Sequence, residues 1–281
     1  MKPTKENFFK VSDGAFIYYE DYGKENKGDP IVLVHGYLCS TKFFQKNIEA
    51  LSANNRLILV DLRGHGYSSK APWNLTMARC AQDIKELLDA LNIENAVLIG
   101  WSMGGSVVMA YYDQFGSAHL KGIGTLDSCI YPFSDADWNP HAVRDYNMEK
   151  VCNTIEYGTY HHEEYCRGFA KAVFGTAPSK EDEDWVTAEM MKIPAWIAFA
   201  LYCDFVVSDY SVVLDKITIP FFGAGVNSNL IPIGADAAKY YTTRVAGPSY
   251  FHEFYGGHMT FYEDPESFNE VLLDFVNNFA K

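Results

Sequence analysis

The stretch Ile99–Ser106, IGWSMGGS, places a serine between glycines directly after a short apolar run. Its last serine opens a helix-competent segment, SVVMAYYDQF. Gly100-Trp101-Ser102-Met103-Gly104 fits the pattern G-x-S-x-G, whose glycines permit a sharp turn from a strand into a helix. Such a turn holds the serine side chain out over the edge of a sheet, so Ser102 is a candidate nucleophile.

Apolar runs that end in glycine or in polar residues recur along the chain. A short, continuously apolar run is typical of a strand that is buried on both faces of a parallel sheet. These runs are Pro30–Gly36, Arg56–Gly66, Asn95–Ser102, Leu120–Ser128 and Lys216–Gly225, and a more polar edge strand is expected at Ser249–His258. Two aromatic-rich runs around Ser12-Asp13-Gly14 predict a hairpin before them.

Helical patterns lie between the predicted strands. Met77–Leu91 carries apolar residues at spacings of three and four, after a cap at Asn74 or Thr76. Phe268–Phe279 repeats the pattern after Asp264-Pro265-Glu266. The alternation predicts an α/β fold, a doubly wound and mostly parallel sheet of about eight strands.

One long segment interrupts this alternation. It has no clear strand and is rich in tyrosine, phenylalanine and tryptophan. We interpret residues 131–213 as a helical cap inserted between strands six and seven, and residues 1–130 and 214–281 as the core.

A nucleophilic serine needs a base, and His258 is the best candidate among the eight histidines. It follows Gly256-Gly257 after the last predicted strand, and ligands of open parallel sheets bind beyond the carboxyl ends of the strands. His35 also lies at a strand end, but the glycine after it favours a structural role.

Four motifs in this order resemble the α/β-hydrolase fold superfamily. They are VHG at Val34–Gly36, DLRGHGYSS at Asp61–Ser69, GWSMGGS at Gly100–Ser106 and GGHMTFYEDPE at Gly256–Glu266. The resemblance covers the chain except for the cap. It implies an α/β-hydrolase core and a Ser, acid, His order of the triad.

The resemblance also implies two backbone donors for an oxyanion, the amides of Met103 and Tyr37. The turn around Asp61 and Arg63 looks structural, and we expect these two side chains to form an ion pair.

The position of the triad's acid differs from the usual pattern of the superfamily. Many members carry this aspartate after the strand expected at Lys216–Gly225, in the pattern G-x-x-D-x-x-x-P. This chain has Gly225-Val226-Asn227-Ser228-Asn229-Leu230-Ile231-Pro232, so Ser228 stands where the aspartate is expected. A serine cannot supply the negative charge that orients the histidine. Some members place the acid one strand earlier, where this chain has Asp127, and Asp204 and Asp209 remain alternatives.

The charge and composition of the chain exclude some classes of binding partner. The 281 residues carry a formal net charge of −13 with no basic stripe, so neither nucleic acid nor a membrane surface is an expected partner. The start shows no secretory signal and the six cysteines are scattered, so we expect a cytoplasmic protein with free thiols. No nucleotide motif or metal-binding spacing is present, so no cofactor or metal is expected.

The sequence therefore predicts a serine hydrolase that cleaves a small-molecule carboxylic ester or lactone with an apolar acyl part, through Ser102, His258 and Asp127. C–C bond hydrolysis and cofactor-free perhydrolysis use the same triad and stay open. A different class, a non-enzymatic small-molecule receptor on the same scaffold, gains if Asp127 does not reach His258.

Overall fold

A computed structural model describes residues 7–227 and 234–280. Within these residues the chain forms one eight-stranded sheet in the order β1-β2-β4-β3-β5-β6-β7-β8. The strands are β1 (Phe8–Lys10), β2 (Phe16–Tyr22), β3 (Gly28–Val34), β4 (Asn55–Val60), β5 (Ala96–Trp101), β6 (Leu120–Leu126), β7 (Phe221–Val226) and β8 (Ser249–Phe254). Among the strands of the described residues, the β1–β2 and β2–β4 pairs are antiparallel and the other pairs are parallel, so the predicted mostly parallel sheet is confirmed.

The predicted hairpin forms between β1 and β2, where Phe8 pairs with Tyr18. The strand expected at Lys216–Gly225 begins later than the sequence predicts. Lys216 is the last residue of a 3₁₀ turn, Ser211–Lys216, and β7 begins at Phe221. Pro220 has no N–H to donate to a ladder, although its carbonyl accepts from the Ile123 amide at 2.9 Å.

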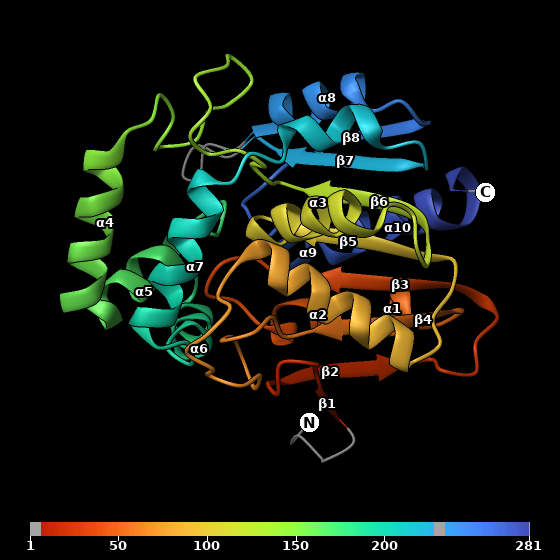
Figure 1. The fold of residues 1–281 in the computed structure, drawn as a ribbon, viewed down its shortest axis with the longest axis horizontal. Helices are drawn as coiled ribbons and strands as arrows, with labels where there is room; N and C mark the ends of the chain where they lie inside the picture. The colour runs from red at the N-terminus through yellow and green to blue at the C-terminus, as the bar shows by residue number, and fades with distance from the viewer. Residues whose placement is uncertain (1–6, 228–233, 281) are drawn as a thin grey trace.

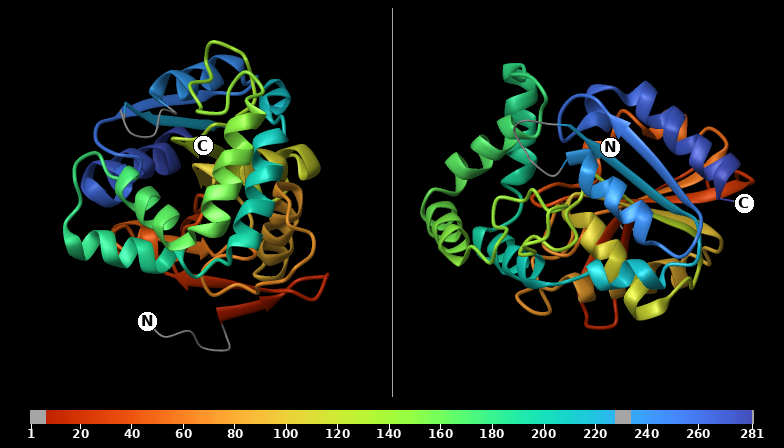
Figure 2. Two further views of the ribbon diagram at one scale, coloured as in Figure 1. Left: turned by 90° about the vertical axis from the view of Figure 1, so that its left-hand side faces the viewer. Right: turned by 90° about the horizontal axis from the view of Figure 1, so that it is seen from above.

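Helices cover both faces of the sheet. Figures 1 and 2 show α2, α3 and α8 on one face and α1 and α10 on the other. The helices are α1 (Ile48–Leu51), α2 (Met77–Ala90), α3 (Met103–Phe115), α4 (Met148–Tyr160), α5 (His162–Ala172), α6 (Lys180–Met190), α7 (Ala195–Val207), α8 (Gly234–Arg244), α9 (Thr260–Glu263) and α10 (Pro265–Asp274). All six residues of β5 are buried, as a central strand between two helical layers requires.

Local capping fixes where two of these helices begin. The Thr76 hydroxyl accepts from the Arg79 amide at 3.1 Å, so Thr76 rather than Asn74 caps α2. The Asp264 carboxylate accepts from the Ser267 amide at 3.2 Å at the start of α10.

Four helices, α4 to α7, separate β6 from β7 in the chain. In Figure 1 they lie together on the left, the side to which the arrowheads of β3 and β7 point. In the described part of the chain no single helix is long and apolar enough to cross a membrane. Among these described helices, α6 and α7 are long and apolar enough when they are taken together, but the chain bends by 85° between them.

The predicted ion pair between Asp61 and Arg63 is wrong. The Asp61 carboxylate instead accepts from the amide of Thr41, in the segment after β3, at 2.6 Å and from the amide of Tyr67, in its own loop, at 2.7 Å. Complete burial raises the pKa of Asp61 to about 6, against the effect of those two amides. Its charge is therefore matched by backbone donors and not by the nearby guanidinium.

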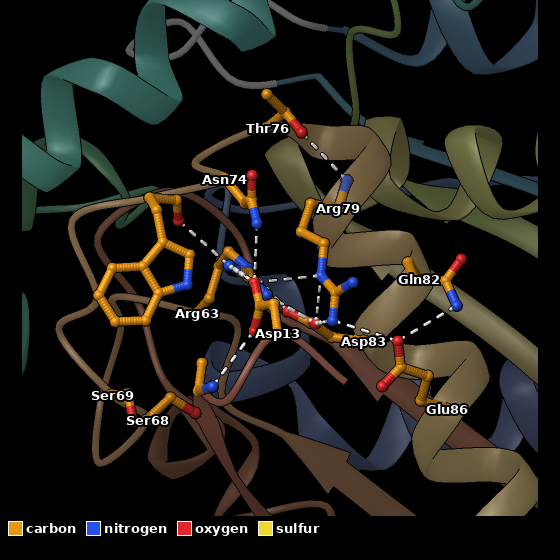
Figure 3. Close-up of polar contacts among 12 residues, drawn as sticks. Asp13, Arg63, Ser68, Ser69, Asn74, Thr76, Arg79, Gln82, Asp83 and Glu86 are labelled. Carbon is orange, nitrogen blue, oxygen red and sulfur yellow. Dashed lines mark hydrogen bonds and ion pairs between the residues drawn. The ribbon is translucent and has the colours of Figure 1, made fainter. Parts of the chain in front are cut away.

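Arg63 points the other way, toward the hairpin and α2 (Figure 3). Its guanidinium is fully buried and donates twice to Asp83, at 2.7 Å each, and once to Asp13 at 3.1 Å. Arg79 also pairs with Asp83, at 2.9 Å. Because Asp13 lies in the hairpin turn and Asp83 in α2, Arg63 joins the hairpin, the loop after β4 and α2.

We expect Arg63→Lys to lower the free energy of unfolding by about 3 kcal/mol, because a lysine cannot replace the paired donors and leaves a buried carboxylate under-satisfied. Urea unfolding measures this change. Arg244→Lys is the matched control, since Arg244 makes the same two-pronged contact with Asp215 but both side chains are exposed. Equal shifts in the two variants would contradict the role assigned to the buried network.

Candidate active site

The turn between β5 and α3 is made possible by glycines. Ser102 has φ 55° and ψ −126°, a backbone conformation that costs a non-glycine residue about 1–3 kcal/mol. A Cβ on Gly104 would lie 2.5 Å from the Val34 carbonyl oxygen, and one on Gly100 would lie 2.2 Å from the Gly104 oxygen. Close packing therefore requires glycine at both glycine positions of the pattern G-x-S-x-G, because the backbones of β3, the turn and α3 are in direct contact there.

Hydrogen bonds from the end of β6 hold this strained turn. The Ser102 amide donates to the Leu126 carbonyl at 3.0 Å, and the Ser128 hydroxyl donates to the Ser102 carbonyl at 2.6 Å. A Cβ on Gly105 would fall 2.1 Å from the Ser128 oxygen, so the next glycine makes room for that contact. The surrounding structure therefore fixes the conformation that the serine alone would avoid.

Asp127 and His258 meet in the structure. His258 Nδ1 lies 2.6 Å from Asp127 Oδ2, and both residues are buried, at 1% and 0% exposure. The second oxygen, Asp127 Oδ1, accepts from the Val226 amide at 3.0 Å. A carboxylate at Nδ1 selects the tautomer that carries its proton there, which leaves Nε2 able to accept one.

The loop after β3 lies against the serine. A Cβ on Gly36 would be 2.8 Å from Ser102 Cβ and 3.2 Å from its Oγ, so the backbone next to Tyr37 approaches the nucleophile position closely. On the other side, Met103 is the first residue of α3. The first amides of a helix have no intrahelical acceptor and point toward its N-terminal end. The two backbone amides predicted as oxyanion donors therefore belong to segments that flank Ser102.

His35 holds the same loop, as its predicted structural role requires. Its Nε2 accepts from the Leu62 amide at 3.0 Å, and its Nδ1 lies 2.8 Å from the Gly36 carbonyl. Full burial lowers the pKa of His35 to about 4, so the ring is neutral near pH 7. Both nitrogens are occupied by the backbone, which leaves neither for substrate.

Comparisons with known proteins identify the fold. A sequence profile of the alpha/beta hydrolase fold family matches residues 29–148. An esterase from Exiguobacterium antarcticum superposes with a TM-score of 0.87 at 23% identity, over 97% of this chain and 99% of that one.

The chain has the α/β-hydrolase fold.

Relatives that match this chain over nearly its whole length carry more than one name. The AB hydrolase superfamily protein YisY of Bacillus subtilis (strain 168) is 25% identical over 97% of this chain and 99% of its own length. The non-heme chloroperoxidase CPO-A1 of Kitasatospora aureofaciens is 25% identical over 94% of this chain and 97% of its own length.

Trp101, between the glycine and the serine of the motif, has a role that sequence reasoning missed. Its indole Nε1–H donates to the His258 carbonyl at 2.9 Å, and the two rings are 5.1 Å apart. The amide of Met259, the next residue, donates to the Val173 carbonyl at 3.0 Å. The loop that carries His258 is therefore held from β5 and from the segment after α5. Nothing in the spacing of the motif indicates a partner so far along the chain.

The alternative acids bind elsewhere. The Asp204 carboxylate accepts from the Met77 amide at 2.7 Å, and Asp209 accepts from the amide and hydroxyl of Ser211 at 2.9 and 2.6 Å. Ser228, which occupies the family's usual acid position, lies outside the described residues. Within the described residues, Asp127 is the carboxylate hydrogen-bonded to the His258 ring.

Among residues 7–227 and 234–280, no group of three or more histidine, cysteine, aspartate or glutamate side chains could hold an ion.

We expect Gly104→Ala to unfold the turn or displace α3, because its Cβ has no space between the Val34 and His35 carbonyl oxygens. Thermal unfolding should show a drop of several degrees in Tm. Gly168→Ala is the matched control, since Gly168 lies within α5 with no atom within 4 Å of the added Cβ. Alanine has the higher helix propensity, so this control should unfold at the same temperature or a higher one. A Gly104→Ala variant as stable as the wild type would contradict the close packing.

Proposed function

We propose that the protein is a serine esterase that works through Ser102, His258 and Asp127. The observation that carries this proposal is the 2.6 Å contact between His258 Nδ1 and Asp127 Oδ2. Ser102 stands in a strained turn, and its amide donates to the carbonyl of Leu126, the residue before Asp127, at 3.0 Å. The receptor hypothesis depended on an Asp127 out of reach of His258, and this contact removes that reason for it.

The proposed chemistry follows from the three side chains. Ser102 Oγ attacks the ester carbonyl carbon while His258 Nε2 takes the hydroxyl proton. The tetrahedral oxyanion accepts from the Tyr37 and Met103 amides, and His258 then returns the proton to the departing alcohol. A water molecule, deprotonated by His258, attacks the acyl-enzyme and releases the carboxylic acid and free Ser102. Asp127 keeps the imidazole oriented and stabilises its charged form throughout.

We further propose that residues 131–213 form a cap that roofs this site. The Tyr37 ring packs against Phe169 of α5 at 6.1 Å and against Tyr202 of α7 at 5.7 Å, so the residue after Gly36 is in contact with two of the inserted helices. Tyr165 packs against Phe199 at 5.4 Å on the same side. Aromatic surroundings of this kind favour an ester or lactone with an apolar acyl part.

Perhydrolysis is the second candidate. The full-length similarity to a protein named as a non-heme chloroperoxidase favours it. In that reaction hydrogen peroxide would replace water as the attacking molecule, and the acyl-enzyme would release a peracid. Two rates distinguish the candidates: turnover of p-nitrophenyl acetate, and formation of peracid from acetate and hydrogen peroxide. If peracid formation is the faster reaction, the esterase proposal is rejected.

The triad is tested with p-nitrophenyl esters of increasing chain length. Ser102→Ala should abolish turnover and labelling by a fluorophosphonate probe, and Asp127→Asn should lower kcat by about 10⁴-fold because the histidine loses its orienting charge. Asp209→Asn makes the same chemical change at an exposed position and should keep full activity. Ser228→Ala should also keep it. Full activity in Asp127→Asn, or no labelling of the wild type, would reject the proposed mechanism.

Trp101→Phe should lower kcat by about 10-fold, because it removes the donor that fixes the His258 backbone while keeping an aromatic ring. Steady-state kinetics on the best ester measures the change. Trp196→Phe, in which the replaced side chain is 52% exposed on α7, is the control and should leave kcat unchanged. A normal kcat in Trp101→Phe would show that this hydrogen bond does not position the base.

A further inference from the structure

A buried carboxylate of α6 contacts the loop that follows β3. Glu189 is 5% exposed, and its Oε2 accepts from the Ser40 hydroxyl at 2.8 Å. Ser40 is itself buried, at 2% exposure, and is 149 positions away in sequence. This contact joins the inserted helices to the segment that carries Tyr37.

Two lysines balance the charge of Glu189. Lys192 Nζ lies 2.7 Å from Oε1, and Lys42 Nζ lies 3.5 Å from the same oxygen. Lys192 also stands over the Tyr67 ring, 4.3 Å from its centre. A carboxylate that is removed from water needs such partners, and here they hold it in place as an acceptor for Ser40.

The core holds the rest of the same loop. The Cys39 amide donates to the Gly36 carbonyl at 3.2 Å, and the Thr41 amide donates to Asp61 Oδ1 at 2.6 Å. Ser40 lies between these two anchors, and its side chain is directed to α6. The position of the loop therefore depends on β3, on β4 and on Glu189.

We propose that Glu189 is a positioning residue, which acts through Ser40 to fix the loop that presents the Tyr37 amide to the oxyanion. The inference rests on the serine-esterase chemistry proposed above. Hydrogen bonds to an oxyanion strengthen in the transition state, so a displaced donor lowers kcat more than it changes KM. The cap would thus contribute to the rate as well as covering the site.

The variants Ser40→Ala, Glu189→Ala, Glu189→Gln and Ser40→Ala/Glu189→Ala test this. Ser40→Ala removes the hydrogen bond and leaves the lysine partners in place. Glu189→Gln keeps an amide oxygen that can still accept from Ser40. Glu181→Ala is the control, since Glu181 is an exposed glutamate in the first turn of the same helix.

Two readouts are compared. Hydrogen exchange of the segment 35–45 should become faster in Ser40→Ala and in Glu189→Ala, and should be unchanged in Glu181→Ala. With p-nitrophenyl butyrate, kcat should fall about 10-fold in each of the two variants while KM stays within about twofold. The double variant should be no slower than the slower single variant, because both changes break one contact. Glu189→Gln should recover most of the rate.

The outcomes separate this proposal from the proposed function. Unchanged exchange in Ser40→Ala and Glu189→Ala would overturn the positioning role, whatever the activity. Faster exchange with a normal kcat would overturn the link to the oxyanion donor, and additive losses in the double variant would overturn action through Ser40. A wild type without ester turnover would reject the esterase, while the exchange comparison would still decide whether Glu189 fixes the loop.

Discussion

The rest of this structure depends on a close approach of backbone segments. The end of β3, the turn after β5 and the start of α3 pack against one another with no side chain between them. Gly100 and Gly104 leave no space for a Cβ, and Gly36 leaves almost none beside Ser102. Because these segments lie so close, the serine is forced into its positive φ, and the loop that carries Tyr37 is brought to the N-terminal end of α3.

The order of the strands explains how an aspartate after β6 reaches a histidine after β8. Asp127 follows β6, His258 follows β8, and β7 lies between them in the sheet. The carboxylate spans that gap, since one oxygen accepts from Val226 at the end of β7 and the other contacts the histidine ring. Asp127 therefore receives a backbone donor from β7 in addition to the histidine.

Patterns in the sequence predicted the parts that depend on neighbours along the chain. Apolar runs located the strands, and glycines located the turn at Ser102, because both follow from local backbone geometry. The prediction of an Asp61–Arg63 ion pair was wrong because closeness in sequence does not fix the direction in which a side chain points. Asp61 accepts from the Thr41 amide, whereas Arg63 donates to Asp83 of α2. The sequence did not indicate the contacts of Trp101 and Glu189, because their partners lie 157 and 149 positions away along the chain.

The sequence by itself determined the α/β class, the position of the sharp turn and the identity of Ser102 and His258 as candidates, because spacing and local conformation encode them. Only the tertiary structure decided which carboxylate reaches His258, where Arg63 finds its charge partners and how α6 touches the loop after β3. Those contacts depend on strand order and on the packing of inserted helices against the core, which bring together side chains that no local pattern relates.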